Sequence, residues 1–124
     1  MLLELPLESA EPNLDHGHEK WRLIEWAPGY EVSSLGGFRH CVRGTLNGTV
    51  ANNGYRHVGF IVDGGQLIRL AHRVVAETFL PNPRRHPVVN HKNGDRIDNR
   101  VANLEWASRS HNSKDAWARK RGVA

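Results

Sequence analysis

The most informative part of this chain runs from residue 87 to residue 112 and reads PVVNHKNGDRIDNRVANLEWASRSHN. Its valines predict a short buried strand at 87–91, which ends on the polar pair Asn90-His91. A polar stretch of Gly, Asn, Asp and Arg follows at 92–103, and a second strand is expected at 104–108. A loop of twelve residues in so small a protein needs either internal hydrogen bonds or a function. The pattern therefore predicts a hairpin whose polar residues gather near the strand ends.

Two helices are expected on either side of this hairpin. Residues 72–80 place their apolar side chains on one face of a 3.6-residue period, and prolines follow directly. A final helix is expected at 110–121, with Ser110 as its cap and Asn112 near its positive N-terminus. An imidazole at a strand end facing oxygen ligands on a helix is an arrangement suited to hydrolysis.

The first half of the chain predicts a small antiparallel sheet region. Its alternating stretches are separated by glycine-rich turns, and one of these turns, Asp63-Gly64-Gly65, is typical of a hairpin. Residues 45–54 are rich in Gly and Asn and are expected to form a loop. Residues 1–19 have no sustained period and are expected to form a flexible acidic arm. The strands are expected at 21–26, 30–33, 38–43, 55–62 and 66–70.

The charge is distributed unevenly along the chain. The whole protein of 124 residues carries a formal net charge of +4. Residues 1–20 sum to −4 and residues 21–71 to +2, while residues 72–124 carry eleven basic against five acidic side chains, which gives +6. A basic C-terminal half suggests a polyanionic partner, although a solvated basic face without a partner would have the same charge.

The composition also argues against several classes of protein. A single cysteine, Cys41, excludes an intramolecular disulfide framework and a cysteine-rich zinc site. No apolar run approaches the length needed to span a membrane, and the N-terminus lacks the features of a secretory signal. We therefore expect an intracellular protein in a reducing compartment, the cytoplasm.

Several of these stretches together resemble the HNH homing endonucleases, enzymes of mobile elements with a ββα-metal active site. The similarity is carried by HRVVAETFLPNP (72–83), VNHKNGD (89–95), NRVANLEW (99–106) and Asn112. Upstream, WRLI (21–24) and GYEVSSLG (29–36) resemble the small β module that often precedes that nuclease unit. The resemblance covers about residues 20–115, and its catalytic part is the specific one because residue types recur at fixed spacings.

The resemblance assigns roles to four residues. It makes His91 the general base that takes a proton from the attacking water. Asn90 and Asn112 would hold one divalent metal ion through their side-chain oxygens, and hard oxygen ligands with phosphate favour Mg²⁺ or Mn²⁺. Asn103 would support catalysis by tying the loop and keeping His91 oriented. The products of the family carry 5′-phosphate and 3′-hydroxyl ends.

The expected fold class is thus α+β, with an antiparallel β module followed by a ββα-metal (HNH, His-Me finger) nuclease unit. The expected divisions are an arm at 1–19, the β module at 20–71 and the nuclease unit at 72–124, in which a linking helix at 72–80 precedes the ββα-metal motif at 87–121. The resemblance implies metal-dependent nicking of double-stranded DNA by a monomer, with a dimer as the alternative. It also implies a phage or intron-homing setting, in the cytoplasm of a bacterial host cell.

Basic side chains around the hairpin are candidates for DNA contact. The main group comprises Arg84, Arg85, Lys92, Arg96, Arg100, Arg109, Lys114 and Arg119. A weaker group on the β module comprises Arg39, Arg43 and Arg56. His72 opens the linking helix, where a structural or phosphate-positioning role is favoured over catalysis. His111 flanks the expected metal ligand, and its role is left open.

One departure from the family keeps an alternative open. Relatives more often carry Asp where this chain has Asn90, so the two expected ligands supply no formal negative charge. We therefore expect weak metal binding without DNA, completed by the scissile phosphate. The alternative is a catalytically decayed module that still binds DNA through its basic surface, with steep salt dependence. A structural zinc protein is disfavoured because paired Cys or His spacings are lacking.

Overall fold

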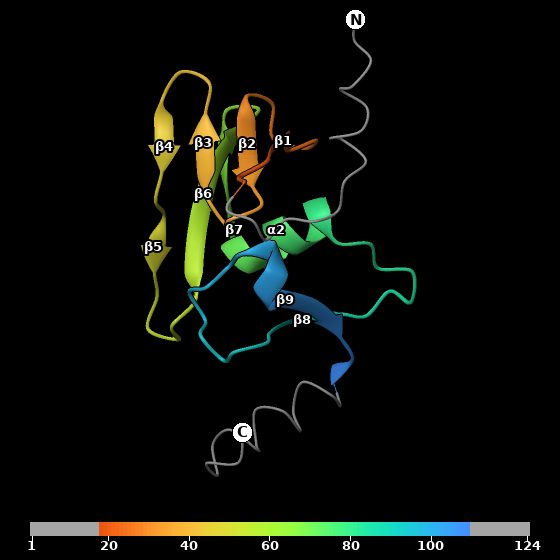
Figure 1. Cartoon of the computed structure of the whole chain (residues 1–124). Coiled ribbons are helices and arrows are strands. Elements are labelled where there is room, and N and C mark those ends of the chain that lie inside the picture. The colour runs from red at the N-terminus through yellow and green to blue at the C-terminus, as the bar shows by residue number, and fades with distance from the viewer. Residues whose placement is uncertain (1–17, 110–124) are drawn as a thin grey trace, which may run out of the picture.

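The computed structural model describes residues 18–109, which form three small antiparallel sheets and two helical segments around one core (Figure 1). The first sheet has the order β1-β2-β3-β4, the second β5-β6-β7 and the third β8-β9. The strands are β1 (Trp21–Leu23), β2 (Tyr30–Ser33), β3 (Phe38–His40), β4 (Gly44–Leu46), β5 (Thr49–Val50), β6 (Arg56–Val62), β7 (Gly65–Leu70), β8 (Val88–His91) and β9 (Leu104–Ala107). The helices are α2 (Ala71–Phe79) and the short 3₁₀ helix η1 (Val101–Asn103). This is the α+β architecture that the sequence predicts.

The N-terminal strands are shorter than expected. The predicted strand at 21–26 ends at Leu23, because the chain then turns, with the Ala27 N–H donating to the Ile24 carbonyl. The strand expected at 38–43 likewise ends at His40, where the next residues turn into β4. The register of β2 on β3, with Val32 opposite Phe38, puts both of these apolar side chains into the core.

The prediction of a loop at 45–54 is wrong for its first half. Residues 44–46 form β4, which pairs with β3, and Thr49–Val50 forms β5, which pairs with β6. Most side chains of these two short strands are exposed, so they show no buried alternation. Backbone pairing with neighbouring strands, and not burial of their own side chains, therefore makes these residues extended.

The core is continuous from the β module to the hairpin of β8 and β9. Phe60 on β6 lies among aromatic rings from the first sheet, and Val74 and Val75 on α2 are also fully buried. The same cluster includes Val89 on β8 and Leu104 on β9. Helix α2 contacts strands of the second sheet as well as β8 and β9, and Figure 1 shows it between them. The helix therefore seats the hairpin on the β module.

The central predicted elements lie close to their expected positions. The helix expected at 72–80 is α2, one residue earlier at each end, and the Leu80 N–H closes it on the Ala76 carbonyl. The strands expected at 87–91 and 104–108 are β8 and β9. The helix expected at 110–121 lies outside the described residues. Within residues 18–109, no helix is long and apolar enough to span a membrane.

Candidate active site

The hairpin of β8 and β9 buries both members of the polar pair. In its antiparallel register Asn90 lies opposite Glu105 and His91 lies opposite Leu104. Asn90 and His91 are only 3% and 4% exposed, although both are polar. Buried polar side chains are normally held by hydrogen bonds, so the partners of these two residues define the site.

Within residues 18–109, the imidazole of His91 has one polar contact and two ring contacts. Its Nε2 lies 2.8 Å from the Oδ1 of Asn99, a buried side chain of the loop between β8 and η1. The ring centre of His72, on the first turn of α2, lies 4.9 Å from that of His91. The ring centre of Tyr55 lies 5.9 Å from that of His91. Tyr55 is the last residue of the β module loop that precedes β6. Three separate segments therefore enclose this histidine.

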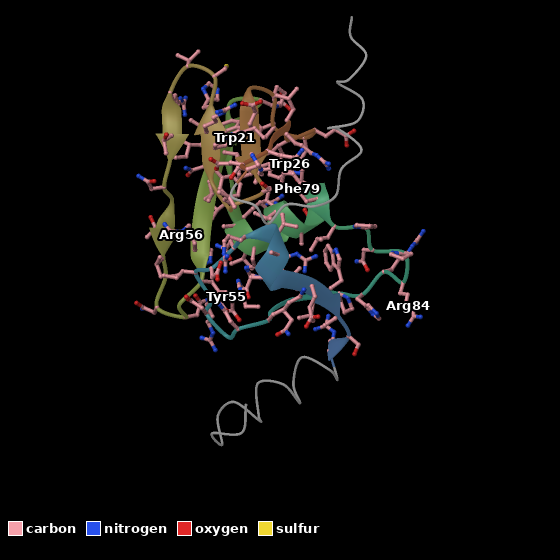
Figure 2. The ribbon with its side chains drawn as sticks, viewed as in Figure 1. Trp21, Trp26, Tyr55, Arg56, Phe79 and Arg84 are labelled. Atoms are coloured by element: carbon pink, nitrogen blue, oxygen red, sulfur yellow. The ribbon has the colours of Figure 1, made fainter. Side chains whose placement is uncertain are left out.

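Tyr55 also connects this enclosure to the long loop. The guanidinium of Arg96 lies 5.0 Å from the centre of the Tyr55 ring, and its Nη1 donates a 2.6 Å hydrogen bond to the Asn53 carbonyl. Figure 2 shows Tyr55 beside the loop that leaves β8. Arg96, which the sequence suggests as a DNA contact, thus also connects the hairpin loop to the β module through Asn53 and Tyr55.

Asn103 ties the loop together through its side chain. Its Nδ2 donates to the Asn93 Oδ1 at 3.0 Å and to the Asp98 carbonyl at 2.9 Å, and its Oδ1 accepts from the Asn93 N–H at 3.1 Å. The Lys92 N–H also donates to the Asn103 carbonyl. These bonds give the loop the internal ties that its length requires. Within residues 18–109, however, the His91 ring is hydrogen-bonded to the side-chain oxygen of Asn99 and not to Asn103.

Asn90 is oriented by a carboxylate on the neighbouring strand. Its Nδ2 donates a 2.8 Å hydrogen bond to the Oε2 of Glu105, its partner across the hairpin. An amide, unlike a carboxylate, has chemically different ends, so a bond to Nδ2 decides which way its oxygen points. The Asn90 side chain, an expected metal ligand, is neutral. The Glu105 carboxylate adds a negative charge beside it.

The residues present fit an oxygen-coordinated divalent cation. No three His, Cys, Asp or Glu side chains converge as metal ligands anywhere in residues 18–109, so this part of the chain contains neither a thiolate and imidazole cluster nor a carboxylate cluster. An oxygen donor on β8 is the side-chain amide of Asn90, whose Nδ2 donates to Glu105. Asn112, the second expected ligand, lies outside the described residues, so its convergence with His91 stays a prediction.

His72 is a buried histidine held in its neutral form. Burial, with smaller contributions from the nearby charges of His91, Arg73 and His57, lowers the pKa of His72 from 6.5 to about 3. Its Nδ1 is the one fully buried side-chain nitrogen or oxygen in residues 18–109 that lacks a hydrogen-bond partner. Its ring also lies 5.1 Å from that of Tyr55. These contacts favour the structural reading of His72.

The lowered pKa of His72 gives a prediction for stability. The unfolded chain takes up a proton at this position below pH 6.5, whereas the folded chain does so only near pH 3. His72 should therefore make the free energy of unfolding fall as the pH drops below 6.5, by up to about 1.4 kcal/mol per pH unit. Urea denaturation at several pH values between 6.5 and 4.5 should show this slope. His72→Gln should lose that part of the slope, and an unchanged slope in the variant would contradict the assignment.

Most of the basic residues predicted to contact DNA are exposed, and some already have partners within the chain. Arg84, Arg85, Lys92 and Arg109 are exposed, and Figure 2 shows Arg84 on the outside of the loop after α2. Arg100 makes two 2.7 Å hydrogen bonds to Asp98, which lower the pKa of that carboxyl to about 2. Lys114 and Arg119 lie outside the described residues. Contact of all these side chains with DNA stays a prediction.

The three arginines of the weaker basic group lie on different elements of the β module, namely β3, the turn before β4, and β6. Arg39 pairs with Glu31 at 2.7 Å, and its guanidinium lies 3.9 Å from the centre of the Trp21 ring. Arg56 donates to the Asn47 carbonyl, and Arg43 is exposed. Arg39 is therefore engaged in packing, which weakens its case as a DNA contact.

Sequence reasoning did not identify three residues of this site. Asn99, Tyr55 and Glu105 contact the predicted residues only because the chain folds back on itself. Glu105 could have been predicted from the sequence, because pairing of the two expected hairpin strands places it opposite Asn90. Asn99 lies in a loop with several other Asn and Asp residues, and Tyr55 belongs to a different predicted unit, so neither could be singled out.

Comparison with known proteins supports the same identity. A family model described as HNH endonuclease matches residues 69–114. Two uncharacterised HNH endonucleases of Acanthamoeba polyphaga mimivirus are 34% identical over 97 residues and 36% identical over 111 residues, and these alignments cover 78% and 84% of this chain. The chain spans only 29% and 27% of the lengths of those two relatives.

The phage protein I-HmuI is similar in sequence and in structure. This DNA endonuclease of Bacillus phage SP01 is 29% identical over 102 residues, which cover 81% of this chain and 59% of I-HmuI. A solved structure described as DNA binding and cleavage by the HNH homing endonuclease I-HmuI matches with a TM-score of 0.74 and 27% identity, over 85% of this chain and 60% of that one. These matches, with the Asn90-His91 pair on the hairpin, place residues 69–114 in the HNH endonuclease family and show that the chain is similar over most of its length to the HNH homing endonuclease I-HmuI.

Proposed function

We propose that this protein is a divalent-metal-dependent DNA endonuclease whose hydrolytic centre is built on β8. The observation that carries the proposal is the buried pair at the end of that strand. There the His91 imidazole is held by Asn99, and the adjacent Asn90 amide is held by Glu105. A proton acceptor and an oxygen ligand are thus held on two consecutive residues at the end of one strand, and hydrolysis of a phosphodiester needs both groups.

His91 is proposed as the general base. Histidine is the side chain best suited to proton transfer near neutral pH. Since Asn99 occupies Nε2, the other nitrogen, Nδ1, is the one that would take a proton from the attacking water. The rings of His72 and Tyr55 keep the imidazole in place, so little reorganisation is needed when the proton moves.

Asn90 and Asn112 are the residues proposed to hold the cation, as Mg²⁺ or Mn²⁺. A bound divalent ion would supply stabilisation of negative charge on the phosphate and on the leaving oxygen. Because both ligands are neutral amides, the protein alone should hold the ion weakly, and the phosphate of bound DNA should complete the site. The Glu105 carboxylate beside Asn90 supports this assignment by adding negative charge near the ion.

Double-stranded DNA is the proposed substrate. I-HmuI is named a DNA endonuclease, and the solved structure similar to this chain concerns DNA binding and cleavage. The net charge of +6 on residues 72–124 supports a polyanionic substrate. We propose that a monomer nicks one strand and leaves 5′-phosphate and 3′-hydroxyl ends, as in intron homing.

Conversion of supercoiled plasmid to the nicked form tests this function. We expect nicking with Mg²⁺ or Mn²⁺ and complete loss of nicking with excess EDTA. Sealing of the nicks by DNA ligase would confirm the proposed ends. If DNA binds with steep salt dependence but no divalent ion supports cleavage, the chain is instead a decayed, non-catalytic DNA-binding module.

A further inference from the structure

We propose that Asn99 is the positioning residue of this site: it holds His91 as the tautomer with hydrogen on Nε2, so that Nδ1 accepts the proton. The inference rests on the proposed function for its catalytic meaning, but the tautomer itself is a property of the free protein. It gives a defined role to a residue that the sequence pattern did not single out.

The hydrogen bond between the two side chains decides the tautomer. The Asn99 Oδ1, which lies 2.8 Å from the His91 Nε2, is an amide oxygen and can only accept. Nε2 must therefore carry the hydrogen, and in a neutral ring the lone pair is then on Nδ1. Rotating the ring by half a turn would put a carbon where Nε2 now lies and would lose the bond, so Asn99 also selects one ring orientation.

The ring contacts support this orientation from other directions. His72 lies 4.9 Å and Tyr55 5.9 Å from the His91 ring, centre to centre. These contacts restrict tilting of the ring, but an aromatic face cannot distinguish a ring nitrogen from a ring carbon that points elsewhere. Only a directional hydrogen bond can make that distinction, and among residues 18–109 Asn99 provides it.

Asn99 is itself held by the β module, although it belongs to a long loop. A Cβ atom on Gly36, whose φ is +89°, would lie only 3.0 Å from the backbone carbon and oxygen of Asn99. Close by, the Val101 N–H donates to the Ser34 carbonyl at 2.8 Å. On the other side, Asn103 binds the Asp98 carbonyl. The backbone is therefore fixed on both sides of Asn99, as a positioning residue requires.

Two substitutions separate a hydrogen-bonding role from a packing role. Asn99→Asp keeps an oxygen acceptor facing Nε2, whereas Asn99→Leu has a similar size and no acceptor. Asn82 provides a control, because its side chain is likewise hydrogen-bonded within a loop, but to the backbone of His86 and not to His91. Asn82→Leu should not change the His91 tautomer.

The direct readout is the ring ¹⁵N chemical shifts of His91 in the full chain at pH 8, from long-range ¹H–¹⁵N spectra. We expect the wild type and Asn99→Asp to show hydrogen on Nε2, and Asn99→Leu to show mixed tautomers. In plasmid nicking, Asn99→Leu should lose about a hundredfold in rate and Asn99→Asp less than tenfold. Hydrogen on Nδ1 in the wild type, or an unchanged tautomer in folded Asn99→Leu, would overturn the inference.

The two proposals fail in different ways. Should Asn99→Leu not fold, the wild-type spectrum alone still decides the tautomer. A wild type that nicks DNA with hydrogen on Nδ1 would overturn the role of Asn99 and leave the nuclease function standing. A wild type with hydrogen on Nε2 that cleaves no DNA would support the hydrogen bond and refute the function.

Discussion

His91→Ala is expected to lower the rate of plasmid nicking by about a thousandfold while the protein stays folded. The effect should be this large because the substitution removes the only proposed proton acceptor, and general bases contribute about 10²- to 10⁴-fold to enzymatic rates. DNA affinity should change little, since no phosphate contact is assigned to the imidazole. The nicking rate at saturating protein should therefore fall. The protein concentration that gives half of the maximal rate should stay the same.

His18→Ala is a suitable control for this variant. His18 is exposed and lies outside the hairpin, so its removal should leave nicking unchanged. The circular dichroism spectrum and the unfolding midpoint of His91→Ala should show that the fold persists. Nicking at the wild-type rate by folded His91→Ala would remove this residue from the mechanism.

Phe60→Ala is expected to lower the free energy of unfolding by about 3–5 kcal/mol. Phe60 is fully buried on β6, and its ring centre lies 5.0 Å from that of Trp26, 5.1 Å from that of Tyr30 and 5.9 Å from that of Phe38. Truncation would leave a cavity at the junction of the first two sheets, and those three rings cannot collapse into it without losing their own contacts. Urea denaturation of both proteins measures the loss.

The neighbouring residue on the same strand gives the control. Ile61 is 45% exposed, so Ile61→Ala should cost well under half as much. Its backbone N–H donates to the Tyr30 hydroxyl, and this bond survives the substitution. Equal losses from the two substitutions would mean that Phe60 does not occupy the centre of the core.

The sequence predicts those parts of the fold in which each segment carries its own pattern. Helix α2 and strand β6 have apolar residues at the period of their structure, whereas β8 and β9 are short segments that contain apolar residues on either side of a polar loop. All four occur close to where they were expected. Strands β4 and β5 have only three and two residues, in a region rich in Gly and Asn, and their side chains are mostly exposed. Their extended form depends on partner strands, which a local pattern cannot reveal.

The same reasoning explains what was predicted of the site. Asn90, His91 and Asn103 were identified through the resemblance of one stretch of chain to the family. The structure places the first two on β8 and shows the third hydrogen-bonded within the loop. Asn99 and Tyr55 contact His91 only after folding. The backbone of Asn99 packs against Gly36, and Tyr55 reaches the site from the β module. Such contacts depend on how the units pack, which no single stretch specifies.

The position of the cation in a complex with DNA is the most direct test of the proposed centre. Crystals of the full chain with a DNA duplex and Mn²⁺ would locate the ion by its anomalous scattering. We predict a single ion at a coordination distance of about 2.1 Å from the Asn90 Oδ1, bound also by Asn112 and by a phosphate oxygen beside His91. An ion bound elsewhere, or a cleaving complex with no ion near Asn90, would contradict the centre proposed on β8.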